Sequence, residues 1–424
     1  MKGFITNVAE EMSQSQIWSV LDHLRDELPA HDMPVTLAAL LYLRWADFQE
    51  AEQEAIAAFD EADYDPVLPA ALHWRSWYNL PPHDLPELFA DRLSPTLERL
   101  NNSRHNSLAT HLHRIASAVK DLGRLSPHAL EALIHWLAEQ PFETPSDRRA
   151  LLGVLDALLD RVPDKSFGEF RTPAAIVGLL VELAAPAPGD RVYDPCFGTA
   201  GLLTAACDHV LRKGKDRFTR NGGPGLMISG VELNPNAFVI GLTRLGLAGV
   251  DDPQLELGNS LERTPPNNPQ QDGFDVVLAN PPWGMRVHPA GLDHFPVRTT
   301  DTTGLFIQHA LAQLRPEGRA VLVVPEGFLF RGGPERKLRK LLVEQHTVEA
   351  VISLPAGVFL PYTGIKASVL LLRRGGPTKN IRMVDAELYF TKGKGNKTAT
   401  IRPDQAQELA RKVRASTPSK NCWD

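Results

Sequence analysis

The chain has 424 residues, of which 43% are hydrophobic and 23% charged, with a formal net charge of −6. This composition is typical of a globular chain of two or three domains, and no apolar run approaches the ~20 residues that a membrane span needs. Three scattered cysteines are too few for a disulfide framework. The absence of a C-x-x-C or H-x-x-x-H pair argues against a metal site, and the absence of a signal-peptide core favours a cytoplasmic location.

The first 165 residues are predicted to be helical. Apolar residues recur there at helical spacing, and proline-rich breaks such as "YNLPPHDLPEL" separate the periodic stretches. The predicted helices cover 16–28, 35–59, 93–100, 108–122 and 128–140. Because almost nothing in this part has the pattern of a strand, we expect residues 1–165 to form a helical N-terminal domain.

From residue 166 the pattern alternates between short apolar strands and helices. Strands are predicted at 191–195, 226–233, 274–280, 319–325 and 348–355, with helices at 174–185, 201–213, 236–249, 305–318 and 334–345. Such alternation is typical of a parallel sheet covered by helices. Two further strands, 366–374 and 380–388, have no long helix between them and suggest an antiparallel finish. We therefore expect an α/β domain over 166–390 and a polar tail over 391–424.

Three strand ends carry polar or glycine residues suited to a ligand, since ligands of open α/β sheets bind at the carboxyl ends of strands. In "VYDPCFGTAGLL", Asp194 ends a strand and Gly198 and Gly201 precede a helix. Glu232 ends the next strand and could accept both hydroxyls of a ribose. Asn259 follows a third strand, and its amide could bond an adenine edge. The alternatives are an ordinary glycine-containing turn and, for Glu232, an acid favoured by a helix dipole.

The fourth strand end, "DVVLANPPWG", combines an amide, a rigid turn and an indole. Pro281 and Pro282 lack an N–H and stop the strand after Asn280, and Trp283 follows at once. The alternative to a functional role is a rigid turn with a packed indole. Together the four strand ends predict a pocket for an adenosine-containing ligand beside an amide and an aromatic ring.

These motifs resemble those of the N6-adenine DNA methyltransferases, most closely the modification subunits of type I restriction–modification systems. "NPPW" resembles the catalytic motif of that family, "DPCFGTAGLL" its first S-adenosylmethionine motif and "FGEFRTP" the stretch before its catalytic fold. "TTGLFIQHALAQLRPEGRAVLVVPEGFLF" and "VISLPAGVFLPYTGIKASVLLL" resemble the same family further on. The chain departs from the family pattern at Arg171, Phe197, Ala200 and Asn259, where an aromatic residue, cysteine, glycine and aspartate are usual.

The resemblance implies a Rossmann-like methyltransferase fold that uses S-adenosyl-L-methionine to methylate the N6 amine of a flipped-out adenine in DNA. The Asn280 side-chain oxygen and the Pro281 carbonyl would each accept one amino hydrogen, the prolines would fix that geometry, and Trp283 would stack on the base. The residues that would hold the donor are Phe170, Thr172, Pro173, Asp194, Gly198, Thr199, Gly201, Glu232, Asn259, Ser260 and Asn280.

The family also implies partners. We expect double-stranded DNA, a specificity subunit and, in some systems, a restriction subunit, so that the chain works in a hetero-oligomer for restriction or another phage defence. Residues 1–165 would then contact DNA or a partner. Two alternatives stay open: methylation of RNA or of a protein glutamine by the same motif, and a scaffold whose methyltransferase pocket has decayed.

Basic residues form three local clusters despite the acidic net charge. Taken singly, each cluster is most simply a solvated face. The clusters are Arg212, Lys213, Lys215, Arg217 and Arg220; Arg331, Arg336, Lys337, Arg339 and Lys340; and Lys392, Lys394 and Lys397.

Overall fold

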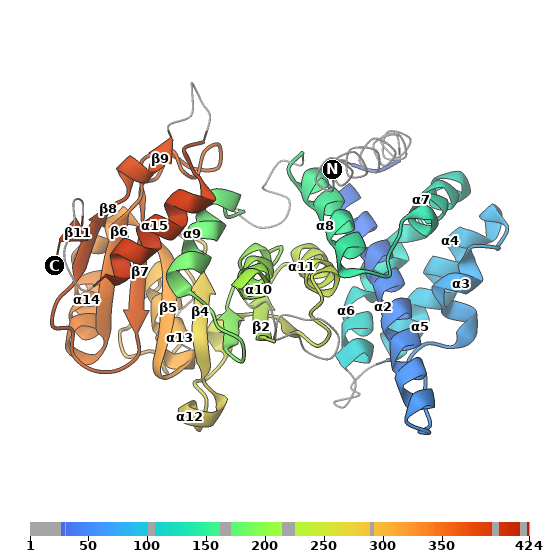
Figure 1. Ribbon diagram of the computed structural model, residues 1–424, viewed down its shortest axis with the longest axis horizontal. Helices are drawn as coiled ribbons and strands as arrows, with labels where there is room; N and C mark the ends of the chain where they lie inside the picture. The colour runs from blue at the N-terminus through green and yellow to red at the C-terminus, as the bar shows by residue number, and fades with distance from the viewer. Residues whose placement is uncertain are drawn as a thin grey trace. The chain divides into compact units, whose positions relative to one another are not determined.

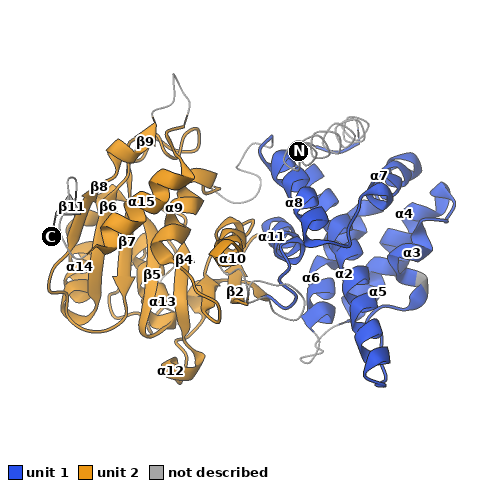
Figure 2. Cartoon of the chain, in the orientation of Figure 1, with its two compact units in different colours: residues 1–166, 235–253 blue, residues 167–234, 254–424 orange. Residues whose placement is uncertain are grey.

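A computed structural model describes residues 27–29, 31–100, 107–161, 171–213, 225–288, 292–391, 398–415 and 422–423. The chain divides into two compact units, coloured separately in Figure 2. Unit 1 comprises residues 1–166 and 235–253, and unit 2 comprises 167–234 and 254–424. Each unit is described by itself below.

Unit 1 is helical in its described part, as the sequence predicts. Its long helix α2 (Met33–Phe59) buries Leu37, Leu40 and Leu41 and packs against α6 (Ser107–Leu122) and α8 (Pro145–Leu159). Helix α8 begins with a capping box, in which the Thr144 hydroxyl accepts from the Asp147 backbone N–H and the Asp147 carboxylate accepts from that of Thr144. Further elements are two 3-10 turns (Ala70–Leu72 and Pro82–Asp84), α3 (Trp74–Trp77), α4 (Leu85–Glu87), a π-helical turn (Leu88–Leu93), α5 (Ser94–Arg99) and α7 (Pro127–Glu139).

Helix α11 (Pro235–Leu247) belongs to unit 1 although its neighbours in the sequence belong to unit 2. The Thr243 hydroxyl donates to the Ala38 carbonyl at 2.9 Å, and Arg244 pairs with Asp156 at 3.0 Å. A Cβ on Gly246 would lie 3.1 Å from the Trp45 ring, so the absence of a side chain lets α11 approach α2 closely. The expected boundary at residue 165 therefore does not separate all residues of the two units.

Unit 2 is built on a nine-stranded sheet of order β11-β8-β6-β7-β5-β4-β1-β2-β3. Strands β1 to β5 run parallel to one another, and β7 is antiparallel to both β5 and β6. Strand β8 is parallel to β6, so only part of the finish is antiparallel. The bounds are β1 (Arg191–Asp194), β2 (Met227–Glu232), β3 (Gln254–Leu257), β4 (Phe274–Ala279), β5 (Leu314–Pro325), β6 (Thr347–Ser353), β7 (Ala367–Arg373), β8 (Arg382–Asp385) and β11 (Cys422–Trp423).

The helices of unit 2 alternate with the parallel strands (Figure 1), which confirms the predicted α/β architecture. Helix α9 packs against both α10 and α15, while α13 contacts β5 and α14 contacts β6. The bounds are α9 (Ala174–Ala184), α10 (Gly201–Lys213), α12 (Pro269–Asp272), α13 (Thr302–Gln313), α14 (Pro334–Gln345) and α15 (Pro403–Arg414), with a small sheet of β9 (Phe390–Thr391) and β10 (Thr400–Ile401).

Two segments differ from the sequence prediction. Helix α13 ends at Gln313 instead of continuing to Gly318, because the residue before Pro316 is disfavoured in a helix and Leu314 instead pairs with Phe274 of β4. The expected polar tail contains α15, which buries Leu409 and Val413. The spacing of Ala406, Leu409, Ala410 and Val413 follows a helical period, so the sequence itself carries a signal for this helix.

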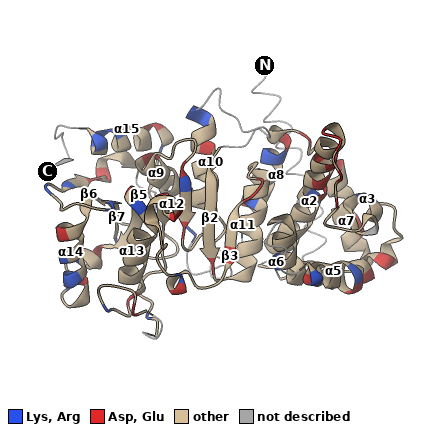
Figure 3. Ribbon diagram, turned by 90° about the horizontal axis from the view of Figure 1, so that it is seen from below, with Lys and Arg blue, Asp and Glu red and all other residues tan. Residues whose placement is uncertain are grey.

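Acidic and basic residues are interspersed over the described helices (Figure 3). The described part of the chain contains no helix long and apolar enough to cross a membrane. Among the same residues, no three His, Cys, Asp or Glu side chains converge as metal ligands would.

Candidate active site

The predicted site residues Asp194, Glu232 and Asn280 lie at or directly after the ends of strands that meet at one edge of the sheet. Strands β1, β2 and β4 run parallel, and β1 lies between β2 and β4. From β1 the chain continues to β2 on one side, and from β3 it crosses back to β4 on the other side of β1. This reversal is the switch point at which open α/β sheets bind ligands. It brings the ends of β1, β2 and β4, at Asp194, Glu232 and Ala279, to a common edge.

Glu232 ties the end of β2 to the loop that follows β1. One of its carboxylate oxygens accepts from the Gly198 N–H at 2.7 Å, and the other accepts from the Asn234 N–H at 2.7 Å. Each carboxylate oxygen can accept a second hydrogen bond, so the group retains acceptor capacity for a ligand. Burial raises the pKa of Glu232, while the backbone N–H donors oppose that shift.

The loop between β1 and α10 adopts a backbone that favours glycine. Gly198 has φ of 56° and Ala200 has φ of 59°, and a Cβ on Gly198 would meet nothing within 4 Å. The backbone at Gly198 is therefore open to a ligand, whereas Ala200 adopts a conformation that costs a residue with a Cβ ~1–2 kcal/mol. Thr199 is buried, and Gly201 is the first residue of α10.

Phe197 occupies its position because the strand beside it carries no side chain there. A Cβ on Gly230 of β2 would lie 2.6 Å from the Phe197 ring, closer than real contacts allow. The Phe197 N–H also donates to the Val231 carbonyl at 3.2 Å. The larger side chain at this departure from the family pattern is thus accommodated by Gly230.

Asp194 is a buried carboxyl group at the centre of this edge. Its side chain accepts from the Cys196 N–H at 3.0 Å, and its residue is 2% exposed. Burial raises the pKa of Asp194 to about 7, and the nearby Glu232 carboxylate adds to that shift. The edge therefore holds two carboxyl groups whose charged forms are penalised, an arrangement that a cationic ligand would relieve.

Asn280 has a fixed amide with one unused oxygen. Its Nδ2 donates to the Thr172 hydroxyl at 3.0 Å. Its Oδ1 is buried and has no hydrogen-bond partner among the described residues. A buried acceptor without a donor costs ~1–3 kcal/mol, and such atoms in native proteins call for an explanation. The Asn280 amide is thus oriented by Thr172, and its Oδ1 can accept a hydrogen bond from a ligand.

The turn after Asn280 is held from α13. The Thr302 hydroxyl donates to the Pro282 carbonyl at 2.7 Å, and the Thr302 N–H donates to the Met285 carbonyl at 3.1 Å. Trp283 is 8% exposed, its ring lies edge-on to Phe359 at 4.9 Å, and its Nε1 has no partner among the described residues. The turn is therefore rigid on one side, and most of the indole is covered.

The other predicted donor-binding residues lie in different settings. Pro173 precedes α9, and Ser260 is buried in a short 3-10 turn. The Asn259 side chain caps that turn: its Oδ1 accepts from the Leu261 N–H at 3.2 Å and its Nδ2 donates to Glu262 at 3.0 Å. Both ends of this amide are thus engaged within the turn. Phe170 lies outside the described residues.

Several apolar residues at the same edge were not singled out by the sequence analysis. Leu233, directly after Glu232, is 72% exposed, and Phe330, shortly after β5, is 74% exposed. Ile365 is also exposed, and the next residue, Lys366, pairs with Glu326 at 2.9 Å. Sequence alone gives no signal for them, because their exposure depends on which strand ends meet.

Comparisons with known proteins show what this chain is similar to. Residues 157–422 match the family model described as N-6 DNA Methylase. The methylase subunit of the type I restriction enzyme EcoEI from Escherichia coli is 31% identical over 359 residues, covering 81% of this chain and 71% of that protein. The corresponding StySJI subunit from Salmonella typhimurium is 25% identical over 381 residues, covering 86% and 67%.

Solved structures give the same result for the fold. A chain from a study of the complex assembly and conformational transition of the type I R-M system matches with a TM-score of 0.79 and 30% identity, covering 98% of this chain and 87% of that chain. The type I methyltransferase subunit from Streptococcus thermophilus has a TM-score of 0.70 at 20% identity, covering 96% and 93%.

Proposed function

The chain belongs to the N-6 DNA methylase family, and from this premise we propose that it methylates the N6 amine of an adenine extruded from double-stranded DNA. The observation that carries the proposal is the buried Asn280 Oδ1 without a partner among the described residues, on an amide that Thr172 holds in place. An exocyclic amino group is the kind of donor that this oxygen lacks.

S-adenosylmethionine, when bound, supplies a methyl group on a sulfonium centre. The residues that would hold it are Thr172, Pro173, Asp194, Gly198, Thr199, Gly201, Glu232, Asn259 and Ser260. The fit is supported by the open backbone at Gly198 and by the remaining acceptor capacity of Glu232 for ribose hydroxyls. The cationic donor would also relieve the penalised charge of Asp194.

The role of Asn280 follows from the weakness of the nucleophile. The lone pair of the adenine amine is delocalised into the ring. Asn280 Oδ1 and the Pro281 carbonyl would each accept one amino hydrogen, which favours a tetrahedral nitrogen with its lone pair available. Thr302 holds the adjoining Pro282 carbonyl, so the turn keeps its direction as charge develops on the amine.

Trp283 would border the extruded base. Only 8% of the residue is exposed, so in this conformation a base reaches a small part of the ring, and full stacking requires the turn to open. The exposed side chains of Leu233 and Phe330 are further apolar surface at the same edge, suited to the faces of adenine rings.

We further propose that the chain works in the cytoplasm with a specificity subunit, and in some systems a restriction subunit, in a hetero-oligomer. The relatives named above are subunits of type I restriction enzymes, which supports this. Sequence readout needs side chains delivered to base edges in a groove, and the α/β domain is accounted for by its sheet, helices and loops. The helical residues 1–165 would contact DNA or a partner.

The test is to sequence DNA for N6-methyladenine in cells with and without this chain and its genomic neighbours. We expect methylation at one motif only when the chain and a specificity partner are both present. Methylation at a defined motif by the purified chain alone would contradict the partner, and donor binding without any DNA methylation would contradict the substrate.

A further inference from the structure

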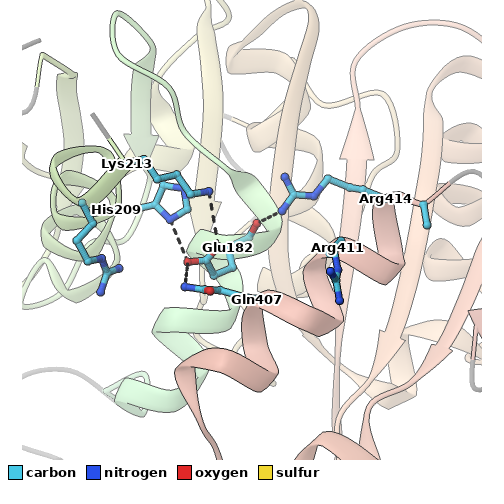
Figure 4. A pocket seen from close by; sticks show the side chains of 8 residues that line it. Glu182, His209, Lys213, Gln407, Arg411 and Arg414 are labelled. Atoms are coloured by element: carbon cyan, nitrogen blue, oxygen red, sulfur yellow. Dashed lines mark hydrogen bonds and ion pairs between the residues drawn. The ribbon is translucent and has the colours of Figure 1, made fainter. Parts of the chain in front are cut away.

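A second set of converging charges lies in unit 2, around the ends of three helices. Seven residues of α9, α10 and α15, together with Ala415 directly after α15, line a cavity of about 800 Å³ (Figure 4). They are Glu182, His209, Arg212, Lys213, Gln407, Arg411, Arg414 and Ala415. Ligand sites in proteins have comparable volumes, ~300–1,000 Å³. We refer to it as the basic cavity.

The basic cavity is separate from the candidate active site. Helices α9 and α10 begin near the strand ends that carry that site, and the cavity residues lie towards their other ends. At the helical rise, Glu182 is about 12 Å along α9 from its first residue, and Arg212 is about 16 Å along α10 from Gly201. A ligand in the cavity would therefore leave the strand ends free.

The cavity is lined by one carboxylate, that of Glu182, and by four cationic side chains, and the carboxylate already has partners. Glu182 lies 3.8 Å from Lys213 Nζ and accepts from Gln407 at 3.5 Å (Figure 4). His209 Nδ1 is 3.3 Å from the same carboxylate without hydrogen-bond geometry. In the described part of the chain, no ion pair or hydrogen bond uses the side chain of Arg212 or Arg411. No partner among the described residues holds either guanidinium group in place, although the Glu408 carboxylate offsets part of the charge of Arg411.

The simplest alternative is that these cations only neutralise helix ends. Cations near helix C-termini are stabilising, and all three helices end here. The terminal carbonyls, however, accept from other guanidinium groups: Arg319 and Arg414 donate to those of α9, and Arg382 donates to those of α15. The terminal carbonyls of α9 and α15 therefore need neither Arg212 nor Arg411, although Arg212 lies in the last turn of α10 and also stabilises that helix end.

His209 gives an independent sign of an unsatisfied site. Its side chain is 1% exposed, yet its Nε2 has no partner among the described residues. Burial lowers the pKa of His209, the Glu182 carboxylate opposes that shift, and the neighbouring Lys213 and Arg212 add to it. An anion placed among these cations would offset their repulsion of a protonated ring.

We propose that the basic cavity binds phosphoryl groups. Planar guanidinium forks bind phosphate oxygens in pairs, and a dianionic or repeated phosphate matches this excess of cations better than a single carboxylate. Two sources share that chemistry, a free pyrophosphate-bearing molecule and a nucleic-acid backbone. The inference does not depend on the proposed methyl transfer, because the cavity residues take no part in it.

The experiment compares two charge-matched double variants of the full chain. Arg212→Gln with Arg411→Gln empties the cavity of two cations, and Arg336→Gln with Lys337→Gln removes two exposed cations from α14. The probes are inorganic pyrophosphate, measured by calorimetry, and a labelled duplex of G·C pairs, measured by fluorescence anisotropy. The duplex offers no adenine, so capture of an extruded adenine at the candidate active site adds nothing to its binding, and the α14 variant controls for backbone contacts outside the basic cavity.

We expect the cavity variant to lose at least tenfold in affinity for one probe, and the α14 variant less than twofold. Loss for pyrophosphate with unchanged duplex binding identifies a free phosphate. Loss for the duplex identifies the backbone, with the slope of log affinity against log salt falling by about 1.8 for two lost contacts. The Glu182→Gln variant should bind the same probe more tightly, because a like charge is removed; structural damage would only weaken binding.

Three results would overturn the proposal. The first is that the wild-type chain binds neither probe. The second is that the cavity and α14 variants lose affinity equally or not at all, while both retain the wild-type melting temperature. The third is that an octaglutamate peptide binds more tightly than either phosphate probe and is lost in the cavity variant, which would assign the cavity to an acidic polypeptide.

Discussion

Replacing Asn280 by alanine separates catalysis from folding. If Asn280 Oδ1 accepts an amino hydrogen of the target, Asn280→Ala should lower the rate of methyl transfer by ~10²–10³, the usual cost of losing one preorganised hydrogen bond to developing charge. Although Asn280 is also among the residues expected to border the donor, donor affinity should change little, because its Oδ1 acts on the acceptor base.

The effect on stability follows from the same contacts. The variant loses the hydrogen bond from Asn280 Nδ2 to Thr172, which is worth ~0.5–1.5 kcal/mol. It also removes the buried Oδ1 that lacks a partner among the described residues, which relieves ~1–3 kcal/mol. Since the two changes oppose each other, we expect the free energy of unfolding to stay within about 1–2 kcal/mol of the wild-type value. A residue kept for structure alone would show a clear loss.

The assay measures transfer of a labelled methyl group to unmethylated DNA by the chain together with its partner subunits. Donor affinity is measured separately by calorimetry, and the free energy of unfolding by titration with urea. Thr172→Val should also lower the rate of methyl transfer, because the Asn280 amide loses the hydroxyl that orients it. Thr172→Ser keeps a hydroxyl and should retain the wild-type rate. Turnover near the wild-type rate in Asn280→Ala would refute the assignment. A loss of more than about 3 kcal/mol in stability would instead show that the residue is structural.

Three further outcomes are expected. Calorimetry should show that Glu232→Ala weakens donor binding by about tenfold or more, which is the cost of one charge-assisted hydrogen bond, whereas Trp283→Phe leaves donor binding unchanged. Equal losses in the two variants would contradict the assignment of Glu232 to the donor and of Trp283 to the base. Ala200→Gly should raise the free energy of unfolding in urea by up to ~1 kcal/mol, because φ of 59° favours glycine, and a loss would show that the strain is absent. Asp194→Asn should stabilise the chain relative to the wild type, and increasingly so from pH 4 to 7. The pKa of Asp194 is raised to about 7 in the folded chain, so as the pH rises the carboxyl ionises first in the unfolded chain, which destabilises the wild-type fold by ~1.4 kcal/mol for each unit between the two pKa values. A difference in stability that stays constant from pH 4 to 8 would refute this.

The sheet and its strand ends could be predicted because each follows from local pattern. Short segments with apolar residues at their centres mark β1, β2 and β4, and the residues at or directly after the strand ends can be read from the sequence. The place of α11 could not be predicted in this way. Its assignment to unit 1 depends on contacts such as Thr243 with Ala38, which lie far apart in the chain and leave no periodic signal.

The candidate site was predictable in its residue types but not in its contacts. Asn280 and Glu232 were expected at strand ends, yet the bond from Asn280 to Thr172 and the two N–H donors to Glu232 depend on how separate segments meet. The same limit applies to Asn259. Its residue type suits an adenine edge, but its amide is engaged with Leu261 and Glu262, so a part in donor binding requires those contacts to be exchanged.

The departures from the family pattern bear on the alternative of a decayed scaffold. A pocket under no constraint has no reason to keep a glycine opposite an enlarged side chain, yet Gly230 provides the space that Phe197 fills. Nor would it need to keep the Glu232 carboxylate bonded to the Gly198 N–H, or Ala200 in a left-handed conformation that glycine adopts at lower cost. These contacts maintain the backbone path of the loop although two of its side chains differ. They favour a loop kept for a ligand, and donor binding by the intact chain is the property on which the two alternatives differ most.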